Sequence, residues 1–242
     1  MRIAVISDIH ANLHALEAVL AEIDAAPVDE LWCLGDLVGY GPRPNECVAI
    51  VRERASVCLV GNHDLAVVGR LDLALFGGPA GSAAVWTRDV LAAEAHDYLL
   101  GLAPSVRAGE VALAHGSPRD PIWEYVLSEP AAAAAFAATP EPLVLVGHSH
   151  VALSASLHDG RVTGGQAAAG DEVELAHRRH LLNPGAVGQP RDGDPRAAWL
   201  VIDTSEARAT FRRTEYPVER TQAEMRKRSL PDVLAARLAH GL

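Results

Sequence analysis

The stretch Arg2-Ile-Ala-Val-Ile-Ser-Asp8-Ile-His10 is an apolar run that ends at an aspartate and a histidine one residue apart. A β-branched run of this length followed by Ser, Asp and His predicts a buried strand whose carboxyl end delivers Asp8 and His10 into a loop. In an open α/β sheet, ligands bind at that end. Taken alone, the pair is better explained by an Asp that caps the next helix and a His packed beside it.

Four further apolar runs end in polar side chains in the same way. In chain order they are Glu30-Leu-Trp-Cys-Leu-Gly35-Asp36, Val57-Cys-Leu-Val-Gly61-Asn62-His63-Asp64, Val111-Ala-Leu-Ala-His115 and Leu143-Val-Leu-Val-Gly147-His148-Ser-His150. One strand, a crossover helix and a return strand fit between Asp8 and Asp36, so the first two strands are expected to be parallel neighbours. The repeated pattern predicts one site assembled from five strand ends.

Length and composition indicate an ordinary soluble globular protein. The chain has 242 residues, of which 49% are hydrophobic and 21% charged, which suits a single α/β domain over residues 1–242. Its formal net charge of −10 argues against general nucleic-acid binding or attraction to anionic lipid. We see no secretory signal and no apolar run long enough to cross a bilayer, so we expect a cytoplasmic protein without a membrane partner.

Periodicity and turn signals predict parallel pairings early in the chain and hairpins late. The expected helices cover residues 13–23, 45–54 with Asn45 as cap, 65–76, 82–101 with Ser82 as cap, and about 218–242 with Ser229 capping the last; residues 130–142 are an Ala-rich helix or loop. The expected later strands cover residues 106–114, 143–146, 151–157, 161–163, 178–182, 198–203 and 208–216. Helices over residues 65–101 could form a lid. The fold class is α/β, a two-sheet mixed β sandwich flanked by helices.

The polar groups at the five strand ends suit a borderline divalent metal ion. Carboxylate, imidazole and amide oxygen favour Mn²⁺, Fe²⁺ or Zn²⁺, whereas thiolates are absent and the set is too rich in nitrogen for Ca²⁺. The candidate ligands are too many for one ion; they are Asp8, His10, Asp36, Asn62, His115, His148 and His150. If Asp36 bridges two ions, each receives about four protein ligands and keeps positions open for water and substrate.

These motifs resemble the calcineurin-like metallophosphoesterases, dinuclear phosphoesterases with a βαβαβ core. The matching motifs follow the order of that family and are Asp8-x-His10, Gly35-Asp36, Gly61-Asn62-His63-Asp64, His115 and Gly147-His148-x-His150. Val38-Gly39-Tyr40-Gly41-Pro42 and Asn183-Pro184-Gly185-Ala186-Val187-Gly188 look like its small bacterial and archaeal, phosphodiesterase-like branch. The resemblance therefore covers nearly the whole chain.

The resemblance implies a role for each matching residue. It places Asp8, His10 and His150 on a first metal ion and Asn62, His115 and His148 on a second, with Asp36 between them. It implies that a metal-bridging water or hydroxide attacks phosphorus in line, and that His63, oriented by Asp64, acts as general acid or stabilises transition-state charge. We expect Mn²⁺, with Fe, Zn or Ni as alternatives.

The resemblance also bears on the substrate. Phosphomonoesterases of this family, such as protein phosphatases and diadenosine tetraphosphatases, usually carry a Glu after the Asn-His and an Arg shortly beyond it. This chain has Asp64 and no Arg before Arg70, which favours a phosphodiester or a small nucleotide-like substrate. Tyr40, Asn12 and Arg191 are candidate substrate contacts. A phosphomonoesterase, a nucleotide pyrophosphohydrolase and a non-catalytic binding scaffold stay open as alternatives, and a homo-oligomer is compatible with the sequence.

Overall fold

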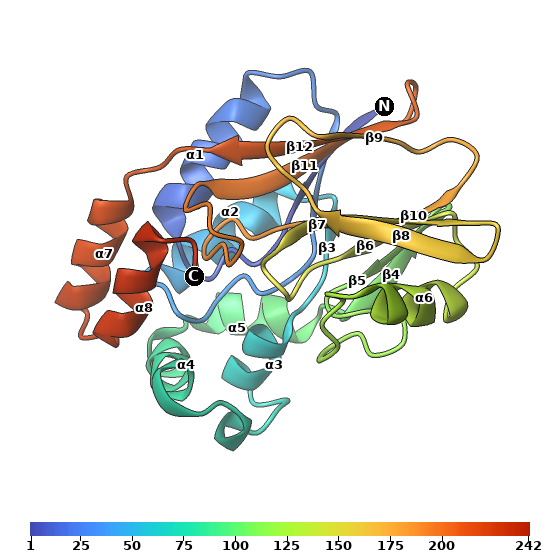
Figure 1. The fold of residues 1–242 in the computed structure, drawn as a ribbon. Helices are drawn as coiled ribbons and strands as arrows, with labels where there is room; N and C mark the ends of the chain where they lie inside the picture. The colour runs from blue at the N-terminus through green and yellow to red at the C-terminus, as the bar shows by residue number, and fades with distance from the viewer.

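The computed structural model describes residues 1–242 and contains two six-stranded sheets packed face to face (Figure 1). The first sheet has the strand order β3-β2-β1-β11-β12-β9 and the second β4-β5-β6-β10-β7-β8. The strands are β1 (Arg2–Ile6), β2 (Glu30–Cys33), β3 (Val57–Cys58), β4 (Ser105–Ala108), β5 (Val111–Ala114), β6 (Leu143–Val146), β7 (Ala152–His158), β8 (Arg161–Gln166), β9 (Glu172–Glu174), β10 (Arg179–Pro184), β11 (Ala197–Asp203) and β12 (Arg208–Thr214). The predicted two-sheet mixed sandwich is confirmed.

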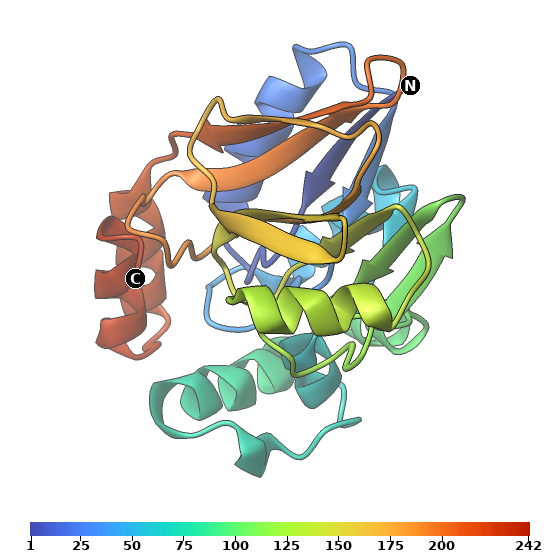
Figure 2. The same ribbon diagram turned by 45° about the vertical axis from the view of Figure 1, so that its right-hand side comes forward.

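Helices cover the outer faces of the sandwich and its lower end (Figures 1 and 2). They are α1 (Leu13–Asp24), α2 (Pro44–Arg54), α3 (Asn62–Val67), the 3₁₀ helix η1 (Leu73–Leu75), α4 (Gly78–Val90), α5 (Ala93–Leu100), α6 (Glu129–Ala137), α7 (Val218–Lys227), α8 (Asp232–Ala236) and the 3₁₀ helix η2 (Arg237–Ala239). Helix α1 packs on the first sheet and α6 on the second. None of the helices combines the length and the apolar character needed to span a membrane.

The burial of strand β1 explains why its sequence is a continuous apolar run. Ile3 and Val5 belong to the core between the two sheets, whereas Ala4 and Ile6 belong to the core under the helices. A strand that is buried on both faces needs apolar residues at every position rather than at alternate ones. Such a strand can carry polar groups only beyond its end, and Asp8 lies there.

Parallel pairing brings the strand ends to one edge of each sheet. β1 pairs with β2 and β2 with β3 in parallel, with α1 and α2 as the crossovers, so the predicted parallel neighbours are confirmed. In the second sheet β5, β6 and β10 are parallel. Carboxyl ends of parallel strands share an edge, and the two sheets therefore present their polar loops together.

Several predicted element boundaries are wrong. Residues 106–114 form the antiparallel pair β4 and β5 instead of one strand, because Gly109 turns the chain at φ +59°. The expected helix 82–101 is two helices, and the first begins at Gly78 without Ser82 as its cap. Asn45 does not cap α2 either: its side chain hydrogen-bonds the backbone of Val90 and Ala92, where α4 gives way to α5.

Three more local predictions fail. The helix expected over residues 65–76 ends at Val67, and only Leu73–Leu75 resume as 3₁₀. The last helix α8 begins after Pro231 rather than at a Ser229 cap. β9 pairs with β12 and was not expected. Gly69, at φ +76°, follows the end of α3 and has a conformation that does not continue a helix.

Candidate metal centre

The seven predicted ligands meet in one buried cluster between the carboxyl edges of the two sheets. None of their side chains is more than 4% exposed. The loops that supply them follow β1 (Asp8, His10), β2 (Asp36), β3 (Asn62), β5 (His115) and β6 (His148, His150). Ionisable side chains are seldom buried in such number without a compensating ion or partner.

Two sets of ligand atoms share one carboxylate. The nitrogen and oxygen atoms of Asp8, His10, Asp36 and His150 lie within 4.8 Å of one another, and so do those of Asp36, His115 and His148. The Asn62 amide oxygen lies 3.2 Å from His115 Nε2, beside the second set. Asp36 is thus common to two groups that could each hold a metal ion.

The backbone determines which ring nitrogen of three histidines faces the cluster. The Nδ1 atoms of His10, His115 and His150 lie 3.0, 2.9 and 2.6 Å from the carbonyl oxygens of Val38, Leu34 and Gln189. A carbonyl oxygen can only accept, so each Nδ1 carries a proton, and Nε2 presents its lone pair whenever the ring is neutral. This is the tautomer of a histidine that coordinates a metal through Nε2.

These lone pairs face one another and carboxylate oxygens. The Nε2 atoms of His10 and His150 are 3.0 Å apart. His150 Nε2 is 3.3 Å from Asp8 Oδ1, and His10 Nε2 is 3.6 Å from Asp36 Oδ2. Neither carboxylate oxygen has a hydrogen-bond partner, although both are buried. A cation satisfies all these acceptors at once, so the residues present fit divalent metal ions.

The pKa shifts in the metal-free protein have the same origin. Burial raises the pKa of Asp8 to about 7 and lowers the pKa of His148 to about 3. Burial also acts to lower the pKa of His115, but the adjacent Asp36 carboxylate outweighs it and raises that pKa to about 9. Burial in the cluster therefore disfavours the charged form of the Asp8 carboxyl group. Divalent cations beside it would stabilise the carboxylate.

The backbone at the strand ends adopts the left-handed conformation that side-chain-bearing residues seldom take. Residues with φ between 48° and 64° include Asp8, His10, Asp36, Tyr40, His148 and His150. Such strain persists where the surrounding structure enforces it, typically at functional sites. A glycine makes room as well: a Cβ on Gly61 would lie 2.0 Å from Asp36 Oδ1.

His63 lies beside the cluster, and we call the group that it forms with Tyr40 and Arg191 the mouth of the site. The His63 side chain is 5% exposed, its Nδ1 has no hydrogen-bond partner, and its ring centroid is 4.4 Å from that of Tyr40. Asp64 does not hydrogen-bond the His63 ring, so it could orient His63 only indirectly. The Asp64 carboxylate accepts instead from the backbone N–H groups of Leu37, Val38 and Gly61 at 3.2, 2.9 and 3.0 Å. Asp64 thus ties the loop after β2 to the start of α3.

Comparison with known proteins identifies the family of the chain. Residues 1–207 match the calcineurin-like phosphoesterase superfamily domain. The chain belongs to the calcineurin-like phosphoesterase superfamily. This phosphoesterase is accordingly a hydrolase of a metal-binding family, and the resemblance drawn from its motifs is confirmed.

Two relatives of this phosphoesterase extend over the whole chain. A crystal structure of a metallophosphoesterase from Sphaerobacter thermophilus is 46% identical with a TM-score of 0.91, over 100% of this chain and 99% of that one. An uncharacterized protein of Methanocaldococcus jannaschii is 36% identical over 250 residues, 99% of this chain and 98% of the relative. A symmetrical bis(5'-nucleosyl)-tetraphosphatase of Actinobacillus pleuropneumoniae is 34% identical over only 70 residues, 28% of this chain and 26% of that protein.

Two of the three predicted substrate contacts of the phosphoesterase lie at the mouth. The Tyr40 ring centroid is 4.5 Å from that of His10, and Arg191 donates to the Tyr40 hydroxyl at 3.4 Å. For Asn12 a substrate contact stays a prediction, although its side-chain atoms already have protein partners. Asn12 is 1% exposed; its Oδ1 caps α1 by accepting from the Ala15 N–H, and its Nδ2 donates to the Gly188 carbonyl. Asn12 therefore joins the start of α1 to the loop that carries Gly188.

The sequence analysis missed Gln189 and Arg237. Gln189 Oε1 accepts from Arg191 at 2.9 Å and from Arg237 at 3.4 Å, and neither arginine has a carboxylate within 4.0 Å. Burial and the charge of Arg191 lower the pKa of Arg237. No motif marks Arg237, because η2 reaches this loop only through tertiary packing.

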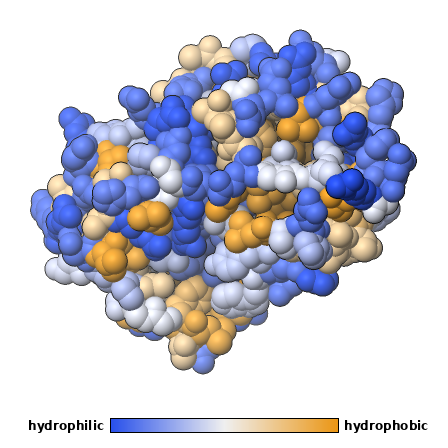
Figure 3. Space-filling model, viewed as in Figure 1, coloured by the Kyte–Doolittle hydropathy of each residue, from blue (hydrophilic) through white to orange (hydrophobic).

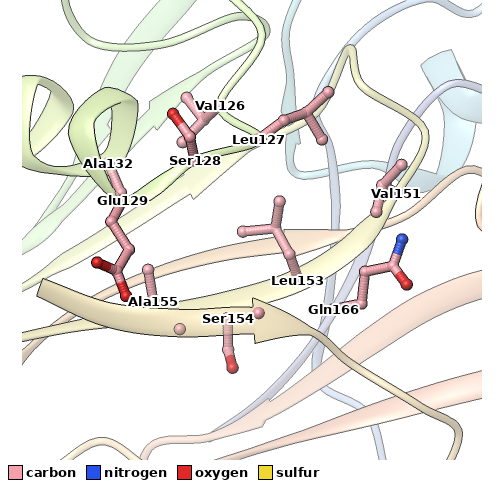
Figure 4. Close-up of a pocket in the computed structure, with 12 residues that line it drawn as sticks. Val126, Leu127, Ser128, Glu129, Ala132, Val151, Leu153, Ser154, Ala155 and Gln166 are labelled. Carbon is pink, nitrogen blue, oxygen red and sulfur yellow. The ribbon is translucent and has the colours of Figure 1, made fainter.

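A hollow of about 300 Å³ lies elsewhere, between the start of α6 and the strands β7 and β8 (Figure 4). Leu127, Val151 and Leu153 line it together with Gly164 and Gly165 of β8. None of the seven predicted ligands lines this hollow. The hollow is mainly apolar and none of the cluster ligands lines it, so we assign the chemistry of the phosphoesterase to the cluster.

Proposed function

We propose that this phosphoesterase is a phosphodiesterase that uses two divalent metal ions, with Mn²⁺ as the expected native metal. One observation carries the proposal: the Asp36 carboxylate is common to two groups of ligand atoms whose lone pairs converge. Bound ions would supply Lewis-acid activation of water and would neutralise charge on the phosphoryl group. We propose the ligand sets that the resemblance implies. Asp8, His10 and His150 would hold the first ion, and Asn62, His115 and His148 the second.

His63 is proposed as the residue that acts on the leaving oxygen. No protein group uses its Nδ1, and its ring lies 5.0 Å, centroid to centroid, from that of His10. A ring in this place can donate a hydrogen bond to an oxygen that gains charge as its bond to phosphorus breaks. Asp64 supports this role indirectly, because it holds the segment on which both Asp36 and His63 depend.

The same mouth favours a second candidate function. Arg191 and Arg237 share Gln189 and lack carboxylate partners, and two guanidinium groups suit a dianionic phosphate. This favours a phosphomonoester or a nucleotide pyrophosphate substrate, as does the partial similarity to a bis(5'-nucleosyl)-tetraphosphatase. Helices within residues 65–101 are proposed as a lid, and residues 1–242 as a single domain.

The test is turnover by metal-stripped protein with Mn²⁺, Ni²⁺, Zn²⁺ and Mg²⁺ added back separately. Aryl phosphodiester and phosphomonoester substrates with the same leaving group are compared. We expect metal-restored activity with the diester preferred. A preference for the monoester would select the second candidate, and full turnover without metal would contradict a metal-dependent mechanism. Absence of turnover with every metal would favour a non-catalytic binding scaffold.

A further inference from the structure

Aromatic rings lead outward from the candidate metal centre. The Phe76 ring centroid is 4.8 Å from that of His63, and the Trp123 centroid is 5.8 Å from that of Phe76. The Tyr125 ring stacks on His148 with centroids 4.1 Å apart and an interplanar angle of 3°. We call Phe76, Trp123 and Tyr125 the aromatic rim. Two distant segments build it, the residue after η1 and the loop between β5 and α6.

Two of the three rim rings are the most exposed aromatic side chains of this chain. Trp123 and Tyr125 are 39% and 49% exposed, whereas Trp32 and Trp199 are only 5% and 3% exposed. Leu75, next to Phe76, is 62% exposed, and hydrophobic residues gather at the lower end of the face in Figure 3, where η1 lies. Large apolar rings held in water beside a buried polar site indicate a ligand surface.

The loop that carries the two exposed rings is held in place by its own hydrogen bonds. Asp120 Oδ1 accepts from the Ile122 and Trp123 N–H groups at 3.2 and 3.1 Å. Glu124 bonds Ser117 and pairs with Arg119. Rings that are ordered in advance lose little conformational entropy when a flat ligand stacks on them.

We propose that the aromatic rim binds a planar aromatic group attached to the phosphate, an aryl group or a nucleobase. This deepens the proposed function and rests on it, because the phosphate itself would lie at the cluster. The inner face of Tyr125 is occupied by His148, so the Trp123 and Phe76 side of the rim is where a ring can stack. Stacking on one aromatic side chain is worth about tenfold in affinity. The net charge of −10 disfavours a polyanionic strand as the ligand.

Binding by the metal-loaded full chain tests the rim without requiring turnover. Calorimetry compares phenylphosphonate with methylphosphonate, and a nucleoside 5'-monophosphate with ribose 5-phosphate. We expect the aromatic member of at least one pair to bind about tenfold more tightly. The pair with the larger ratio identifies the aryl or the nucleobase source, and equal binding within both pairs would overturn the proposal.

Substitutions test whether the rim causes the preference for the aromatic ligand. Trp123→Leu and, separately, Phe76→Leu should reduce the ratio within the selective pair about tenfold. Trp32→Leu is the control, because Trp32 belongs to the core between the two sheets and should leave the ratio unchanged in the folded protein. A ratio that survives both rim substitutions would overturn the assignment. Wild-type protein that binds the ring selectively but turns over no phosphoester would refute the proposed function and not the rim.

Discussion

The floor of the site and its rim are built in opposite ways. The floor, the seven predicted ligands, is at most 4% exposed and sits on turns that directly follow buried strands. The rim consists of Phe76, which follows the 3₁₀ helix η1, and of Trp123 and Tyr125 in the loop between β5 and α6. Two of its rings are more than a third exposed. The difference separates two tasks: the floor must hold charges in a fixed geometry, whereas the rim needs only flat surfaces.

The two regions should therefore respond differently to substitution. A floor residue such as His10 is held through its Nδ1 by the Val38 carbonyl, so its replacement leaves buried polar atoms without partners. Replacement of the exposed rim residue Trp123 removes one ring contact within the protein, that with Phe76, and the surface on which a ligand could stack. Substitutions in the floor should therefore have larger effects than substitutions outside it.

Asp36→Asn should have the largest effect, because the substitution removes the charge shared by both ligand groups. Asp36 Oδ1 also accepts from the His63 N–H at 2.9 Å. We expect kcat/KM to fall on the order of 10³-fold and metal content to fall with it. Kinetics and elemental analysis measure both. Asp97→Asn, at an exposed carboxylate, is the control, and retention of metal and turnover by Asp36→Asn would refute the shared role.

Gly61→Ala should come next, since it adds one methyl group to the floor without changing any charge. The new Cβ would lie 2.0 Å from Asp36 Oδ1, and a displacement of about 1 Å costs on the order of 10²-fold in rate. We also expect the unfolding free energy to fall by about 1–3 kcal/mol. Denaturant unfolding and kcat/KM provide the measurements. Wild-type values of both would mean that the loop yields without cost.

Arg191→Gln tests the polar side of the mouth. Loss of a charge-assisted contact should raise KM about tenfold with a smaller change in kcat. The effect should be larger for a phosphomonoester, which carries more charge than a diester. Arg196→Gln is the matched control on the same loop, because Arg196 is paired with Asp194. Equal KM values for the two variants would exclude Arg191 from the binding of substrate.

Gly165→Ala should have the smallest effect. An added Cβ meets no atom within 4 Å, so the unfolding free energy should change by less than about 0.5 kcal/mol. Because the hollow is separate from the cluster, kcat/KM should stay within about twofold of wild type. A clear loss of activity would show that the hollow and the floor are coupled, and the contrast between the two methyl additions at Gly61 and Gly165 would fail.

Local patterns were sufficient for the floor. Each ligand follows an apolar run, and a strand buried on both faces has to place its polar residues beyond its end. The spacing between Asp8 and Asp36 matches one crossover, which made β1 and β2 parallel neighbours, as found. The sequence by itself therefore determined the two-sheet class, the convergence of the strand ends and the seven residues that meet there.

Tertiary structure decided the partners of those residues. Asp64 follows His63 in the chain, yet its carboxylate accepts N–H groups from the loop after β2. Asn12 has a polar side chain that could contact a substrate, and its Nδ2 donates to the Gly188 carbonyl. Arg237 and the rim carry no motif at all. A hydrogen bond, an ion pair or a stacked ring depends on atoms brought together from distant positions in the chain, whereas strand burial is already encoded in neighbouring residues.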